Sequence, residues 1–224
     1  EPIIDGSYPP AKPALHLHGW SFFLWYLLVP FQAILITRGK HILHKTLGYI
    51  SIMLVIVMTL TGLLVLSVRV DEATRNGAPE VWLLYGPLIL SKLVLFVSFY
   101  SAAIYMALKK RLSAHMRLVI VASAIALGAG FFRLILFLSG FHPLSLPAGT
   151  LGCSLFIVIG IAYDWFAHHK IHRVYLIGLI ALLLVEISLL PQLNGETVDW
   201  INQGLATLGD QLGTLYTPEP TIEF

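Results

Sequence analysis

Charge is scarce in this chain of 224 residues: only 12% of them are Asp, Glu, Lys or Arg, whereas 57% are hydrophobic. A soluble domain of ordinary composition carries about 25% charged residues, so this chain lacks the charge that a water-soluble surface needs. The mean hydropathy is +0.82, and the few charges lie in short stretches between long apolar runs. The sequence therefore predicts an all-α, polytopic membrane protein surrounded by lipid. It argues against nucleic acid as a partner despite the pI of about 8.7.

Other absences narrow the classes of function. The single cysteine, Cys153, excludes a disulfide framework. The sequence contains no G-x-S-x-G, no H-E-x-x-H, no P-loop and no desaturase-type histidine boxes, so the reactions that those motifs carry are not expected. No apolar run is polar along a whole face, which argues against a wide aqueous channel. The Gly/Pro-broken helix pairs of secondary transporters are not evident either.

Six apolar runs are long enough to form membrane-spanning helices, each of which needs about 20 mostly apolar residues. Helices are expected because lipid cannot satisfy unpaired backbone groups, and because these runs do not alternate as barrel strands do. They form a predicted domain of residues 18–192, between an N-terminal segment of residues 1–17 and a tail of residues 193–224. The runs cover residues 19–37, 46–68, 81–108, 118–138, 148–167 and 174–190.

The basic residues predict how the helices are oriented, because cytoplasmic loops carry an excess of Lys and Arg. The turns after the first, third and fifth runs hold nine basic residues and no acidic one, whereas the other side holds three basic and ten acidic residues. We therefore expect both termini outside the cytoplasm and the three basic turns inside it. The nine are Arg38, Lys40, Lys45, Lys109, Lys110, Arg111, Arg117, Lys170 and Arg173.

The tail carries one apolar stripe at helical spacing, which predicts a short amphipathic helix. Such a helix either lies on the outer membrane surface or docks a partner subunit through residues 195–224. It lacks the basic face typical of lipid-surface helices, which favours the partner. The stripe consists of Trp200, Ile201, Leu205, Leu208, Leu212 and Leu215.

Histidine followed closely by a basic residue stands at the cytoplasmic start of the second, fourth and sixth runs: His44, His115 and His172. The partial positive charge of a helix N-terminus disfavours protonated imidazole, so we expect the neutral form that ligates metals. Asp164 lies at a similar depth in the fifth run. If these helix ends converge, the three histidines and Asp164 could hold Zn or Fe, or a single haem b, with Arg117 contacting an anion. The alternative is that they merely anchor helix ends among lipid headgroups.

Ionisable residues at bilayer depth are costly, so each is a functional hypothesis. Besides Asp164 they are Lys92, Arg133 and Glu186. From their positions along the third and sixth runs, Lys92 and Glu186 are within reach of each other. These charges either line a path for protons or a substrate, or are paired groups that join helices.

Several motifs resemble those of a family of uncharacterised bacterial multi-pass membrane proteins, over about residues 16–180. In place of the proline that commonly follows the last histidine of the family, this chain has Arg173. The family has no established activity, and it is distantly similar in style to the bundles of cytochrome b561 and ferric reductases, where haem b lies between histidines of different helices. No histidine here lies well inside a run, which disfavours two haems and leaves open one haem at the cytoplasmic edge. The resemblance also implies the inner membrane of a bacterium. The motifs are His16-x-His18, Trp25, Gln32, Leu43-His44-x-x-Leu47-Gly48, Ala114-His115-x-Arg117-Leu118, Arg133, Asp164 and His172-x-Val174-Tyr175-Leu176.

The sequence thus favours a membrane protein with a His/Asp metal or haem site at the cytoplasmic face and a redox or metal-linked role. Its rival is a non-catalytic accessory subunit of a larger membrane complex. A third reading is a membrane metallohydrolase, in which zinc at the same site activates water.

Overall fold

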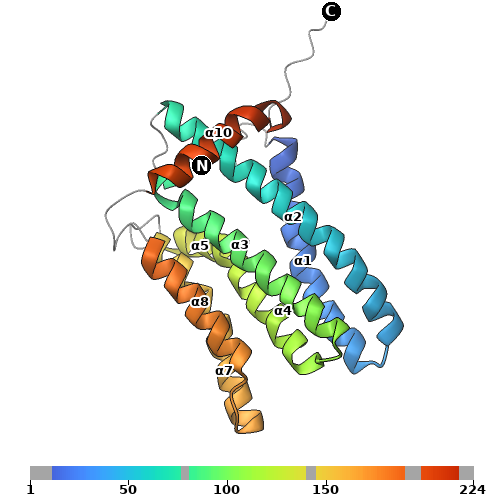
Figure 1. Cartoon of the computed structure of the whole chain (residues 1–224). Helices are drawn as coiled ribbons and strands as arrows, with labels where there is room; N and C mark the ends of the chain where they lie inside the picture. Colours follow the sequence, from blue (N-terminus) through green and yellow to red (C-terminus); the bar gives the residue numbers. More distant parts are fainter. Residues whose placement is uncertain (1–11, 77–80, 140–144, 190–197, 217–224) are drawn as a thin grey trace, which may run out of the picture. The chain divides into compact units, whose positions relative to one another are not determined.

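The computed structural model describes residues 12–76, 81–139, 145–189 and 198–216, and all the regular structure in these ranges is helical (Figure 1). Three of the helices are long and apolar enough to cross a membrane: α1 (Pro13–Thr37), α2 (His41–Asn76) and α3 (Val81–Leu108). The described residues are thus all-helical, as predicted, and three of the six expected spans meet the length and hydropathy of a membrane-spanning helix. The chain divides into two compact units, one of residues 1–82 and 200–224 and the other of residues 83–199.

The first unit is a helical hairpin with the tail helix packed on it. Gly39 turns the chain between α1 and α2 with φ of +68°, a conformation that glycine adopts without the steric cost that a Cβ brings. The predicted tail helix is α10 (Asp199–Tyr216), and it packs closely on α2: a Cβ added at Gly209 would lie 2.2 Å from the backbone oxygen of Ser67. Arg75 of α2 adds an ion pair to Asp210 of α10.

The second unit is built on α4 (Leu112–Ala126), α7 (Ser154–His168) and α8 (Arg173–Leu189), which pack against one another. Two glycines allow close approach. A Cβ at Gly178 of α8 would lie 2.5 Å from Cγ1 of Val121 in α4, and one at Gly160 of α7 would lie 2.6 Å from the Tyr175 ring. The helices are therefore held at short separation along their middle turns.

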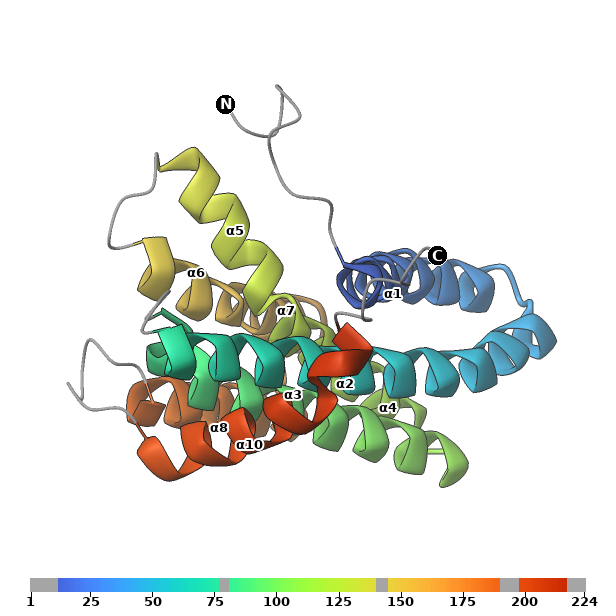
Figure 2. The same cartoon turned by 90° about the horizontal axis from the view of Figure 1, so that it is seen from above.

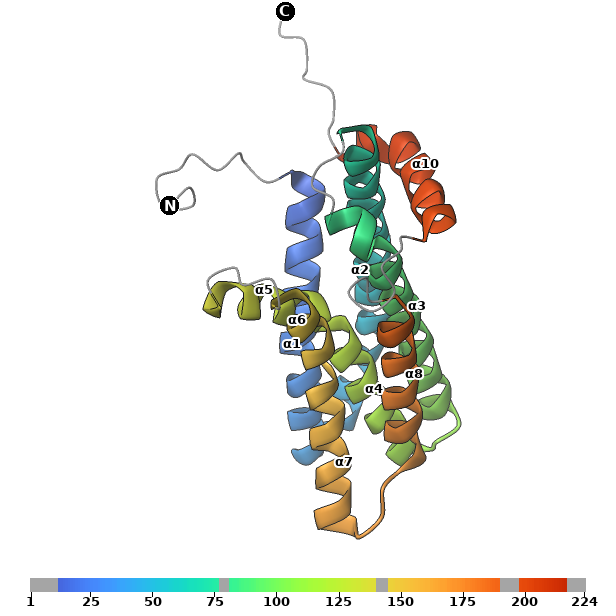
Figure 3. The ribbon, with the colours of Figure 1, turned by 90° about the vertical axis from the view of Figure 1, so that its left-hand side faces the viewer.

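Two of the expected spans are broken helices. The run 118–138 is divided at Leu127 into α4 and α5 (Gly128–Leu138), and the run 148–167 is divided at Cys153 into α6 (Ser145–Gly152) and α7. α5 and α6 pack side by side (Figure 2), and α5 runs across the direction of α4 (Figure 3). Hydropathy reports composition, not backbone continuity, which is why the sequence predicted unbroken helices here. At about 1.5 Å per residue, α5 and α6 are each too short to cross about 30 Å of hydrocarbon.

Candidate functional site

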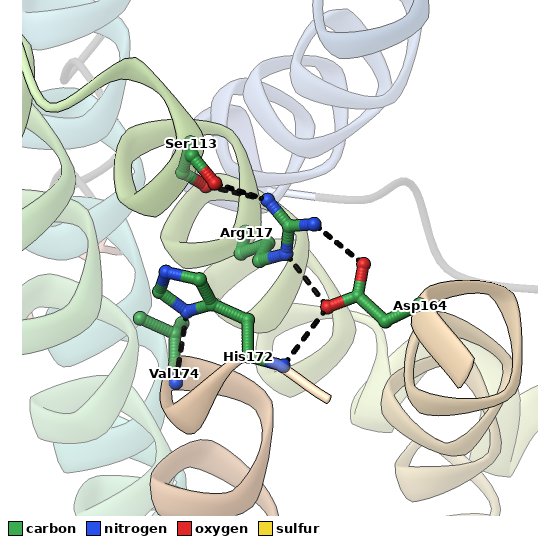
Figure 4. Close-up of polar contacts among 5 residues, drawn as sticks. All are labelled: Ser113, Arg117, Asp164, His172 and Val174. Atoms are coloured by element: carbon green, nitrogen blue, oxygen red, sulfur yellow. Dashed lines mark hydrogen bonds and ion pairs between the residues drawn. The ribbon is translucent and has the colours of Figure 1, made fainter. Parts of the chain in front are cut away.

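Arg117, Asp164 and His172 meet at the end of the second unit where α4 starts and α7 ends (Figure 4). The Arg117 guanidinium donates to both carboxylate oxygens of Asp164, from Nε at 2.8 Å and from Nη2 at 2.5 Å. Asp164 is 1% exposed and Arg117 is 6% exposed. Ser113 oxygens accept from Nη1 at 2.6 and 3.0 Å. The pair is thus bidentate and desolvated, the geometry in which an Arg–carboxylate contact is strongest.

His172 closes this cluster from the start of α8. Its backbone N–H donates to Oδ2 of Asp164 at 3.1 Å, and its Nδ1 accepts from the backbone N–H of Val174 at 3.2 Å. The ring therefore caps the helix as an Asn or Ser side chain would, and this requires an unprotonated Nδ1. Burial, together with the charge of Arg117, lowers the pKa of His172, which agrees with the neutral imidazole expected at this position.

The sequence-predicted ligands are only partly gathered. Arg117, Asp164 and His172 lie together, but the Asp164 oxygens are taken up by Arg117 and the His172 backbone. The Nδ1 of His115 instead contacts α3, where it lies 2.9 Å from the carbonyl oxygen of Ala103. His44 belongs to the first unit. Among the residues that the structure describes, no three His, Cys, Asp or Glu side chains are placed to hold a metal, so the metal or haem site stays a prediction.

A hollow of about 420 Å³ opens beside the cluster. Four of its lining residues come from the first turns of α4, and the fifth comes from the last residue of α7. They are Leu112, Ser113, Met116, Arg117 and His168.

A second buried charge cluster lies near the helix breaks. Lys92 of α3 forms an ion pair with Oε1 of Glu186 in α8, as their depths suggested. Glu186 is fully buried and Lys92 is 8% exposed. The Sγ atom of Cys153 lies 3.7 Å from the Lys92 Nζ and 3.8 Å from Oε1 of Glu186. Oε2 of Glu186 has no hydrogen-bond partner within the described part of the chain.

Both helix breaks contribute to this second cluster. Cys153 is itself the residue between α6 and α7, and a Cβ added at Gly128, the first residue of α5, would lie 3.1 Å from the Lys92 Nζ. Sequence reasoning identified Lys92 and Glu186 but missed Cys153 and Gly128, because a lone cysteine and a glycine in apolar runs carry no spacing signal. Arg133, also singled out from the sequence, lies exposed on α5.

Comparison with protein-family models, with curated proteins and with solved structures gives no match. The function must therefore be inferred from the chemistry of these two clusters.

Proposed function

We propose that the chain crosses the inner membrane of a bacterium six times, with both termini and the tail outside the cytoplasm. The nine-to-three bias of basic residues between the two sides supports this orientation. α1, α2 and α3 supply three spans. In the remaining three, α8 crosses as one helix, and the pairs α4–α5 and α6–α7 each enter as a broken helix.

Within this topology, we propose that the second unit translocates protons across the membrane. The observation that carries the proposal is the fully buried Glu186, paired through one oxygen to Lys92, at the level where two helices are broken. A buried ion pair stabilises a fold poorly because the desolvation of its charges offsets their attraction. Intramembrane ionisable residues accordingly mark proton and ion pathways, and broken helices line the sites of many transporters.

The residues suggest how a proton would pass. A hydronium ion on one side transfers a proton to Oε2 of Glu186. One of its O–H bonds breaks and leaves water, an O–H bond forms at Oε2, and the carboxylate loses its negative charge. Lys92 keeps its proton, but its attraction to the now neutral Glu186 weakens, so the ion pair opens. The breaks at Leu127 and Cys153 allow the α5–α6 hairpin to move, which exposes Glu186 to the other side. There the O–H bond breaks, water takes the proton, and the pair with Lys92 forms again, with no change of redox state.

The test is proton flux into proteoliposomes that contain the full chain and a pH-sensitive dye, driven by a potassium diffusion potential. We expect flux above that of protein-free vesicles and its loss in Glu186→Gln, which keeps the volume of the side chain but cannot ionise. The matched control is Glu72→Gln, because Glu72 forms an exposed pair with Arg69 at the end of α2. Flux from the parent equal to that of empty vesicles, or an unchanged rate in Glu186→Gln, would refute the proposal.

His115 favours a second candidate function, the metal-linked or haem-linked role. A carbonyl oxygen can only accept, so Nδ1 of His115 is the donor to Ala103. Metal-ligating histidines show this arrangement, in which the other ring nitrogen donates to a backbone carbonyl. Metal analysis and an absorption spectrum of the purified protein test it. A Soret band or about one equivalent of metal should be lost in His115→Ala and kept in His169→Ala.

A further inference from the structure

The hollow beside Arg117 is lined by both apolar and polar side chains. Leu112 and Met116 form the apolar part, whereas Ser113, Arg117 and His168 supply the polar groups. Leu112 is 66% exposed and Met116 is 50% exposed. The exposed rings of Trp165 and Phe166 precede His168 on α7. A ligand with both a polar head and an apolar chain suits such a surface better than a small ion does.

The residues next to the hollow in the chain are basic and exposed. Lys109, Lys110 and Arg111 lead into Leu112, and Lys170 and Arg173 follow His168. Asp164 is the only acidic residue of this end of the second unit, and Arg117 neutralises its charge through two hydrogen bonds. The two turns that adjoin the lining residues in the chain, both of this unit, therefore carry an excess of exposed positive charge.

We propose that this hollow binds one anionic phospholipid of the cytoplasmic leaflet. The phosphate of its headgroup would lie among the basic side chains of the two turns, and an acyl chain would lie along Leu112 and Met116. Basic pockets between transmembrane helices on the cytoplasmic side recognise anionic headgroups in this way. The assignment of the leaflet depends on the orientation proposed above, whereas binding of the lipid does not depend on proton translocation.

Native mass spectrometry of the full chain in detergent tests this lipid-binding site, with phosphatidylglycerol or phosphatidylcholine added in equal amounts. We expect one phosphatidylglycerol to be retained and phosphatidylcholine to be lost. Lys110→Gln/Arg111→Gln/Arg173→Gln should lower the affinity for phosphatidylglycerol roughly 100-fold, because each basic residue near an anionic lipid surface contributes about fivefold. The matched control is Arg38→Gln/Lys40→Gln/Lys45→Gln, which removes three exposed charges from the turn between α1 and α2 and from the start of α2.

Two further arms separate a lipid from other anions and from diffuse attraction. Leu112→Asn/Met116→Asn should weaken retention without removing any charge, and inorganic phosphate should not displace the bound lipid. An equal loss of affinity for phosphatidylglycerol in both triple variants would show diffuse headgroup attraction and overturn the proposed site. Displacement by millimolar phosphate, or equal retention of phosphatidylcholine, would also overturn it. All the substituted side chains are exposed, and a thermal unfolding curve for each variant checks that it is folded. Proton flux in the basic triple variant reports on the other proposal separately.

Discussion

The second unit buries two ion pairs that differ in how completely their charges are satisfied. In the pair Arg117–Asp164, two guanidinium nitrogens contact the two carboxylate oxygens, and the backbone of His172 donates a third hydrogen bond. In the pair Lys92–Glu186, one ammonium contacts one oxygen, and the remaining oxygen has no hydrogen-bond partner among the described residues. Both carboxylates are almost entirely removed from solvent.

This difference separates two roles for buried charge. A carboxylate that already accepts three hydrogen bonds resists protonation, because a proton would displace a donor. The Arg117–Asp164 pair, which joins α4 to α7 and to the start of α8, therefore has a structural role. We call this pair the clasp. A carboxylate with one oxygen that accepts no hydrogen bond takes a proton at that atom without first displacing a donor. The Lys92–Glu186 pair is accordingly the site to which we assign proton exchange.

The largest expected effect is the loss of the clasp. Asp164→Ala leaves the Arg117 charge buried without its partner, which should cost about 3–5 kcal/mol in the free energy of unfolding. Denaturant unfolding in detergent micelles measures it. Arg117→Met/Asp164→Leu should recover most of the loss, because it removes both charges and fills their volume. A variant Asp164→Ala as stable as the parent would show that the clasp does not hold the helices.

The same double replacement at the other pair should separate stability from function. Lys92→Met/Glu186→Leu removes both charges of a buried pair in which one oxygen of Glu186 has no hydrogen-bond partner among the described residues. The free energy of unfolding should therefore stay within about 2 kcal/mol of the parent or rise. Proton flux in proteoliposomes should nevertheless fall to the level of empty vesicles. A large loss of stability here would mean that both pairs are structural, and the contrast between them would disappear.

The apolar layer between the two pairs offers a smaller perturbation. Gly178→Ala places a Cβ 2.5 Å from Cγ1 of Val121, so α8 and α4 must separate, at a cost of about 1–3 kcal/mol. Thermal unfolding in detergent measures the loss. Gly48→Ala in α2 is the matched control. Nothing lies within 4 Å of its added Cβ, and alanine favours a helix over glycine by about 1 kcal/mol. A lower stability for the control than for Gly178→Ala would contradict the close packing.

The smallest effect is the titration of His172. Its pKa is lowered in the fold, so the unfolded chain binds a proton at higher pH than the folded chain does. Stability from this residue is therefore complete above its unfolded pKa of about 6.5 and decreases as the pH falls below that value. His172→Asn keeps an acceptor for the Val174 N–H but cannot titrate. The melting temperature of the parent, taken relative to that of His172→Asn, should therefore fall from about pH 7.5 to about pH 5.5. A constant difference would contradict the shift.

The sequence predicted the class of fold and parts of both clusters. Long apolar runs predicted a helical membrane protein, and the stripe in the tail predicted a helix where α10 lies. The ionisable residues at membrane depth identified Lys92, Glu186 and Asp164 as residues that need partners. It did not predict that Arg117, expected to contact an anion, takes Asp164 as its partner. That contact depends on which faces of α4 and α7 meet, and residues 47 positions apart in the chain do not reveal it.

The amino-acid sequence by itself determined the properties that depend on the transfer of residues from water to lipid. They are the apolar character of the chain, its helices and the asymmetry of its basic residues. These follow from composition along short windows, since each residue contributes independently of its distant neighbours. The tertiary structure alone decided where helices break, and which oxygens of the two buried carboxylates are satisfied. Both depend on side chains brought within about 3 Å of one another by packing, at close contacts such as that of Gly178 with Val121, and no local pattern of residues encodes such distances.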